Sequence, residues 1–95
     1  MLCWVIYDIS DTNSRSKIAA KCKDYGLVRV QKSAFLGDLT KNKFEMLAEE
    51  IGSLAKESDD CIFMIPNCRQ CFLDKIIKGK FDVEAIENKD FLIIA

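Results

Sequence analysis

Two segments of the chain are apolar on both faces of a strand. Residues 2–7 are rich in aromatic and β-branched side chains, and residues 59–66 run from two aspartates through "CIFMI" to Pro66. With the strand period of two, Leu2, Trp4 and Ile6 share one face, but the other face is apolar as well. We therefore expect two strands of a sheet that is covered on both sides.

Two further segments follow the spacing of helices. Residues 11–26 begin with the cap candidates Asp11, Thr12 and Asn13 and end at Gly26, and a second helix is predicted to follow Thr40 as its N-cap. The apolar positions are Ile18, Ala19, Cys22 and Tyr25 in the first segment, and Phe44, Leu47, Ala48, Ile51, Leu54 and Ala55 in the second. Lys17, Lys21 and Lys23 are expected on the exposed face of the first helix.

The remaining segments have weaker patterns. Residues 27–39 predict two short strands, with Val28, Val30 and Lys32 on one side and a bend or bulge at Gly37. Residues 68–82 fit either a short helical turn or an extended segment, and residues 91–95, "FLIIA", predict one more strand.

This order of elements predicts an α+β fold, a ferredoxin-like β-α-β-β-α-β sandwich in a single domain over residues 1–95. Two helices cover only one face of such a sheet. Because strands 2–7 and 61–65 are apolar on both sides, we expect a homodimer in which a second copy covers the other face. Residues 78–95 form a C-terminal extension whose strand is predicted to pair with the partner's sheet.

Composition restricts the chemistry. The chain has five cysteines and no histidine, which removes the most common general base and zinc ligand and fits a reducing compartment. The net charge is -1, but the charge is unevenly distributed along the chain. Residues 1–43 contain eight Lys/Arg and four Asp, and residues 44–95 contain six Lys/Arg and eleven Asp/Glu. No apolar run approaches the roughly 20 residues that span a bilayer, and no secretory signal pattern is present, so we expect a cytoplasmic protein without membrane contact.

The first predicted strand ends on a carboxylate. Asp8 falls on the face of Leu2, Trp4 and Ile6, so a two-fold mate would bring a second Asp8 near it. Magnesium accepts one or two carboxylates, keeps several waters and completes its shell with phosphate oxygens. Arg15 and Lys17 follow in the predicted helix and supply charge for those phosphates. The alternative is ordinary turn and cap chemistry, above all at Asp11.

The chain also resembles a known family. The stretches "YDISD" and "GLVRVQKSAFLGDL", an arginine four residues after Asp11, the "IP..C..C" segment and the closing "FLIIA" are similar to those of the CRISPR-associated small nucleases, the Cas2 family. The similarity extends over nearly the whole chain. It implies a dimeric ferredoxin-like fold with a C-terminal strand laid against the partner.

The resemblance further implies a metal-dependent endonuclease of RNA or DNA. Asp8 is then the catalytic, metal-binding carboxylate for Mg²⁺ or Mn²⁺, and Arg15 and Arg29 lie near the phosphate. The candidate nucleic-acid-binding residues are Arg15, Lys17, Arg29 and Lys32. Asp11, Ser33 and Phe35 are candidate supporting residues, although a core role is favoured for Phe35. Lys17 stands where some relatives carry arginine, and Ala34 where a bulkier residue is usual.

Competing functions remain open. The family also implies a central subunit between copies of the Cas1 integrase during spacer acquisition, so a non-catalytic dimeric scaffold for duplex DNA is the alternative to the nuclease. The nucleic-acid partner is then duplex DNA, single-stranded RNA or both. A plain interaction module is a third. Cys68 and Cys71 form a Cys-x-x-Cys pair, which is half of a zinc site or a thiol redox pair. One chain lacks further ligands for zinc, so only a site that bridges two protomers would complete it, and the pair lacks a thioredoxin-like setting for redox chemistry.

Overall fold

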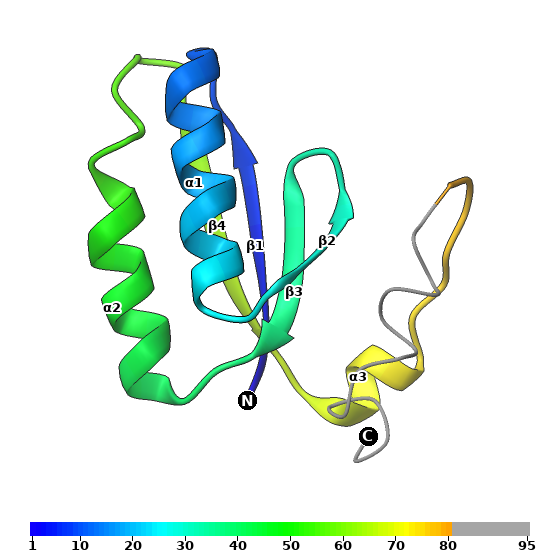
Figure 1. The fold of residues 1–95 in the computed structure, drawn as a ribbon. Coiled ribbons are helices and arrows are strands. Elements are labelled where there is room, and N and C mark those ends of the chain that lie inside the picture. The colour runs from blue at the N-terminus through cyan, green and yellow to red at the C-terminus, as the bar shows by residue number, and fades with distance from the viewer. Residues whose placement is uncertain (81–95) are drawn as a thin grey trace.

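Figure 1 shows the fold in a computed structural model, which describes residues 1–80. The elements are β1 (Leu2–Asp8), α1 (Thr12–Asp24), β2 (Val28–Gln31), β3 (Ala34–Asp38), α2 (Lys41–Gly52), β4 (Cys61–Asn67) and the short α3 (Arg69–Leu73). The predicted β-α-β-β-α-β order is confirmed. Residues 91–95, with the predicted terminal strand, lie outside the described residues.

The four strands form one antiparallel sheet in the order β2-β3-β1-β4. Strand β1 lies in the middle, where Val5 pairs with Phe35 of β3 on one side and with Met64 of β4 on the other. This order is that of the predicted ferredoxin-like fold, which is confirmed. Pro66 is tolerated in β4 because an edge strand has one side without a neighbouring strand.

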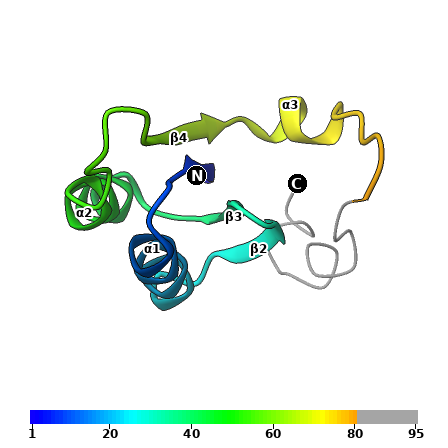
Figure 2. The ribbon, with the colours of Figure 1, turned by 90° about the horizontal axis from the view of Figure 1, so that it is seen from above.

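Helices α1 and α2 cover one face of the sheet, and α3 lies on the side of the other face (Figure 2). The main core fills the space between the sheet and the two helices. Its buried members come from β1, both helices, β3 and the loops beside them: Cys3, Val5, Tyr7, Ile9, Ile18, Ala19, Cys22, Leu27, Phe35, Leu39, Leu47 and Ile51. Burying this apolar surface is the principal force that holds the helices on the sheet.

Local sequence signals set the start of both helices and the end of α1 as predicted. The Asp11 carboxylate accepts a hydrogen bond from the Ser14 backbone N–H at 2.8 Å, and the Thr40 hydroxyl accepts one from Lys43 N–H at 3.2 Å. Gly26, with φ of 84°, follows the end of α1 in the left-handed conformation that glycine adopts readily.

Two details of the second helix differ from the prediction. Helix α2 ends at Gly52, so Leu54 and Ala55 pack on the main core from the loop that follows rather than from the helix. Ala48, predicted in the apolar stripe, is exposed, because it lies about 100° around the helix from the buried Leu47.

The predicted bend at Gly37 is wrong. Gly37 lies within β3 opposite Cys3, and the irregularity falls in β2 between Arg29 and Gln31. Gly37 is instead required by close packing, since a Cβ there would lie 2.4 Å from Cδ2 of Leu27. Lys32, expected on the same side as Val28 and Val30, lies in the turn between β2 and β3.

The second face of the sheet carries a smaller cluster and exposed apolar side chains. Leu2, Val30, Leu36 and Phe72 are buried together there, and Phe72 comes from α3. Within the ambiguous segment after β4, Arg69–Leu73 therefore form a short helix. Farther along the same face, Ile6, Phe63 and Ile65 are 36%, 53% and 43% exposed. No helix within residues 1–80 is long and apolar enough to cross a membrane.

Candidate nucleic-acid interface

A pocket of about 490 Å³ opens where β1 ends, α1 begins and β2 turns into β3. Its lining combines one carboxylate with three cationic side chains and several polar groups. The residues are Tyr7, Asp8, Ile9, Thr12, Arg15, Ser16, Arg29, Lys32 and Ser33. The fold thus brings five predicted residues together from separate parts of the chain: Asp8, Arg15, Arg29, Lys32 and Ser33.

Asp8 is the last residue of β1 and is exposed. It pairs with Cys61 of β4 and, by the strand period, lies on the same face of the sheet as Trp4 and Ile6. Within residues 1–80, no hydrogen bond or ion pair engages its carboxylate. The carboxylate is therefore available to a ligand at the edge of the exposed apolar face.

Arg15 holds the loop between β1 and α1. Its guanidinium donates to the carbonyl oxygens of Ile9 at 2.9 Å and Ser10 at 3.0 Å and to the Thr12 hydroxyl at 2.9 Å. These contacts fix the planar group at the wall of the pocket. Arg15 therefore shapes the loop that follows Asp8 as well as adding positive charge.

Arg29 is positioned by an aromatic ring. Its guanidinium carbon lies 5.1 Å from the centre of the Phe35 ring, within the range of a cation–π contact, and Arg29 pairs directly with Phe35 across β2 and β3. Phe35 is fully buried and stacks on Tyr7, with 6.4 Å between ring centres. Phe35 is thus a core residue that supports the pocket through Arg29. Among residues 1–80, no carboxylate forms an ion pair with Arg29.

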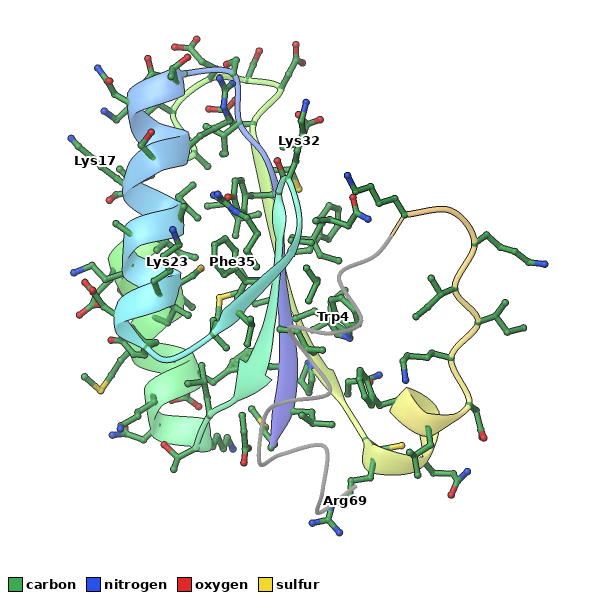
Figure 3. All side chains as sticks on the ribbon, turned by 45° about the vertical axis from the view of Figure 1, so that its right-hand side comes forward. Trp4, Lys17, Lys23, Lys32, Phe35 and Arg69 are labelled. Carbon is green, nitrogen blue, oxygen red and sulfur yellow. The ribbon has the colours of Figure 1, made fainter. Side chains whose placement is uncertain are left out.

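Lys32 and Ser33 form the turn that closes the pocket beside β1. The Ser33 carbonyl accepts a hydrogen bond from the Tyr7 N–H at 3.0 Å, which holds the turn against the end of β1. Lys32 is exposed and projects from this turn (Figure 3). The turn therefore presents an exposed cation on a backbone that is held in place.

Lys17 is predicted beside Asp8, and the structure does not bring it there. In Figure 3 the Lys17 side chain points from α1 away from the sheet and from Lys32. It lines a different groove, with Lys21, Glu50 and Leu54 among its neighbours. Residues two apart on a helix point about 200° apart, so Arg15 and Lys17 cannot both face the pocket.

Asp11 acts as the N-cap of α1 rather than as a pocket residue. Its carboxylate accepts hydrogen bonds from the Ser14 N–H at 2.8 Å and the Ser14 hydroxyl at 2.9 Å. The first of these is the main cause that lowers the pKa of Asp11 below its ordinary value. The carboxylate is thus engaged in helix capping, and it does not line the pocket.

Asp60 supports the site, although no sequence pattern singles it out. Its carboxylate accepts hydrogen bonds from the N–H and hydroxyl of Ser10, both at 3.0 Å, and from the backbone N–H groups of Glu57 and Lys56 at 3.0 and 3.1 Å. The Glu57 bond contributes most to lowering the pKa of Asp60. These hydrogen bonds join Ser10 and Asp60, which are 50 residues apart in the chain. The sequence can therefore predict only the local turn formed with Lys56 and Glu57.

The donor set of one chain is small for a metal centre. Within residues 1–80 no group of three or more Cys, Asp or Glu side chains is placed to hold a metal ion, and Asp8 is the only carboxylate in the pocket. The pocket has more positive than negative side chains, since Asp8 shares it with Arg15, Arg29 and Lys32. A single chain therefore offers a pocket lined by three cationic side chains and one carboxylate.

Comparison with known proteins agrees with this geometry. The family model described as CRISPR associated protein Cas2 matches residues 1–75. The chain belongs to the Cas2 family. It is 43% identical over 89 residues to the CRISPR-associated endoribonuclease Cas2 1 of Archaeoglobus fulgidus, covering 94% of this chain and 95% of that protein.

Two other matches add to the comparison. A CRISPR-associated endonuclease Cas1/endonuclease Cas2 fusion of Thermoproteus tenax is 35% identical over 63 residues, which are 64% of this chain and 24% of the fusion. The crystal structure of Streptococcus pyogenes Cas2 at pH 6.5 superposes with a TM-score of 0.71 at 24% identity, covering 83% of this chain and all of that one. The second match supports the Cas2 fold.

Proposed function

We propose that the chain is a metal-dependent endonuclease that hydrolyses phosphodiester bonds of RNA or DNA. The observation that carries this proposal is the Asp8 carboxylate, which has no partner within residues 1–80 and shares one pocket with Arg29 and Lys32. The cationic side chains can bind the phosphate groups of a nucleic-acid backbone. Cleavage also needs a group that activates a water molecule, and Asp8 supplies the carboxylate for it. The name of the Archaeoglobus relative, an endoribonuclease, supports the same activity.

The residues present fit Mg²⁺ or Mn²⁺ when two chains are combined. One chain supplies one carboxylate, and Mg²⁺ characteristically takes one or two carboxylates together with waters and phosphate oxygens. Asp8 of each protomer would hold the ion. When bound, the ion supplies charge stabilisation at the phosphate and a nucleophile at neutral pH.

The other pocket residues act on the nucleic acid. Arg29, held over Phe35, and Lys32, on the turn, bind phosphate groups of the nucleic acid. Arg15 keeps the loop after Asp8 in place through its contacts with Ile9 and Ser10. The chain contains no histidine, so no imidazole is available for proton transfer.

A homodimer completes this site. Asp8 lies at the edge of the face that carries Ile6, Phe63 and Ile65, and burying these side chains against a second copy of the same face is favourable. A two-fold axis through this face brings the two Asp8 carboxylates toward each other. Two close carboxylates repel unless a cation or a proton lies between them, which favours metal binding.

The fusion protein of Thermoproteus tenax suggests the assembly. Since Cas1 and Cas2 endonucleases occur there on one chain, we extend the proposal to a complex of this chain with Cas1 subunits in spacer acquisition. A second function, a non-catalytic scaffold for duplex DNA, is favoured by one observation: the pocket holds three cationic side chains and a single carboxylate. Both functions use the same cations and differ in their need for Asp8.

The test is cleavage of labelled single-stranded RNA and duplex DNA with Mg²⁺, by the wild type and by Asp8→Asn. Asp24→Asn is the matched control, because it removes the same charge at the opposite end of α1. Dimer mass and circular dichroism are measured for all three proteins. We expect Asp8→Asn to lose cleavage by at least about 100-fold while Asp24→Asn keeps it.

The two proposed functions give different results. Cleavage lost only in a folded, dimeric Asp8→Asn protein supports the nuclease. Absence of cleavage in every protein, with duplex still bound equally by wild type and Asp8→Asn, would reject the nuclease and support the scaffold. Equal cleavage by Asp8→Asn and the wild type would show that Asp8 is not the catalytic carboxylate.

A further inference from the structure

The short helix α3 presents two thiols on its first turn. Cys68 is the N-cap residue and Cys71 lies three positions later, and both are exposed. The Cys68 sulfur accepts a hydrogen bond from the Cys71 backbone N–H at 3.2 Å. The turn therefore holds the two side chains on the same side, at the sequence separation found in dithiol pairs that form disulfides.

The two thiols differ in acidity. A hydrogen bond from the Cys71 thiol and then one from the Cys71 N–H lower the pKa of Cys68, and the same thiol contact raises the pKa of Cys71. Cys68 therefore forms a thiolate more readily, and Cys71 retains its thiol proton. By contrast, burial raises the pKa of Cys3 to about 11 and that of Cys22 to about 12, so these thiols are inert.

Metal binding does not account for the pair within the described chain. A structural zinc site needs four ligands, and in residues 1–80 no third Cys, Asp or Glu joins Cys68 and Cys71 in a metal-binding group. Within one chain, the chemistry open to two adjacent exposed thiols is oxidation to a disulfide. The sequence alone lacks a setting for this chemistry, and the contact between Cys71 and Cys68 supplies it.

We propose that Cys68 and Cys71 are a redox-active dithiol that low-molecular-weight disulfides such as glutathione disulfide convert to an intramolecular disulfide. The Cys68 thiolate attacks one sulfur of the small disulfide, which forms a mixed disulfide and releases one small thiolate. The Cys71 sulfur then attacks the Cys68 sulfur and expels the second small thiol. Two protein thiols lose two electrons and two protons, and one small disulfide becomes two small thiols.

The disulfide acts on the second face of the sheet. Phe72 follows Cys71 directly and is buried with Leu2, Val30 and Leu36, while the Lys75 ammonium lies 3.9 Å from the centre of its ring. Closing the bond between Cys68 and Cys71 fixes the turn that places Phe72 on this face. Oxidation therefore stabilises the packing of α3 against the sheet.

The test starts with the reduced full chain, which is incubated at neutral pH with glutathione disulfide and then analysed by intact mass and peptide mapping. We expect one intramolecular disulfide between Cys68 and Cys71, with Cys3 and Cys22 unmodified. Two variants identify the attacking thiol: Cys71→Ser, which keeps a hydroxyl donor, and Cys68→Ser. We expect Cys71→Ser to accumulate one glutathionyl adduct on Cys68 about tenfold faster than Cys68→Ser gains one on Cys71.

Other outcomes overturn the proposal. Both thiols remaining reduced at a large excess of glutathione disulfide, or equal adduct rates in the two variants, would contradict it. Protection of both thiols that a chelator removes would assign a metal site instead. The wild-type mapping does not depend on either variant folding, and it is independent of whether the chain cleaves nucleic acid.

Discussion

Gly37→Ala is expected to destabilise the protein through a single identifiable contact. Gly37 lies in β3, the strand that carries Phe35, and a Cβ at this position would lie 2.4 Å from Cδ2 and 3.1 Å from Cα of Leu27. Carbon atoms that are not bonded pack at about 3.5–4.0 Å. Leu27 is only 5% exposed and belongs to the main core, so moving its side chain aside would disturb its packing, and the contact with its Cα would remain.

The magnitude follows from the cost of overpacking. An extra methyl group in a filled core typically costs about 1–3 kcal/mol of unfolding free energy, and the backbone contact with Leu27 places Gly37→Ala near the middle of this range. For a domain of this size, about 2 kcal/mol corresponds to a Tm lower by roughly 8–16 °C.

Urea and thermal unfolding followed by circular dichroism measure this effect at one fixed protein concentration, because a dimer's apparent stability depends on concentration. The same substitution at Gly52 is the matched control. No atom lies within 4 Å of a Cβ there, and alanine at this end of α2 should stabilise by about 0.5 kcal/mol.

The combination with Leu27→Ala tests the assigned contact. Because that change removes Cδ2, adding Gly37→Ala to it should cost at least about 1 kcal/mol less than in the wild type. Strict additivity of the two changes, or equal effects of alanine at Gly37 and Gly52, would refute the steric reasoning.

Two further predictions concern the pocket and its support. Arg29→Ala should weaken the binding of duplex DNA. In a salt titration, the slope of log K against log salt should fall in magnitude by about 0.9 for each phosphate group that the protein no longer neutralises. Lys17→Ala, which lies outside the pocket, should leave this slope nearly unchanged. Asp60→Asn should destabilise the chain at pH 7. Because the folded-state pKa of Asp60 lies below its ordinary 3.8, the wild type keeps this stabilisation above pH 3.8 and loses it as pH falls through the lower value. Urea unfolding at pH 7 and at a pH below the folded-state pKa of Asp60 measures the free energy of unfolding of both proteins. The difference in this free energy should shrink on acidification, and a constant difference would count against the stabilising hydrogen bonds of Asp60.

Signals within a few residues of each other predict much of the fold. The caps at Asp11 and Thr40 and the helix stop at Gly26 depend on hydrogen bonds and backbone angles that involve neighbouring residues only. The predicted bend at Gly37 fails because its cause, the packing of Leu27, lies ten residues away on another part of the chain. A glycine inside a strand indicates either a bulge or a close approach, and sequence alone does not separate the two.

The candidate site shows the same division. The strand period places Asp8 correctly on its face, whereas Arg29 is a candidate only through the family resemblance, since its position over Phe35 depends on the pairing of β2 with β3. The misplacement of Lys17 is avoidable, because helical geometry separates it from Arg15. The role of Asp60 could not be predicted in this way, because its contact with Ser10 forms only when the fold is complete.

The balance of charge in the pocket links catalysis to assembly. Arg15, Arg29 and Lys32 belong to one chain, so one protomer is sufficient to attract a phosphate backbone. Asp8 is the pocket's only carboxylate within residues 1–80, so a metal held by two carboxylates requires two protomers. Under the proposed function, nucleic-acid binding would depend on each chain separately, whereas metal-dependent cleavage would depend on how two copies of the face with Ile6 and Phe63 meet. A dimer that held the two Asp8 carboxylates too far apart would then favour the proposed scaffold over the proposed nuclease, with Arg15, Arg29 and Lys32 unchanged.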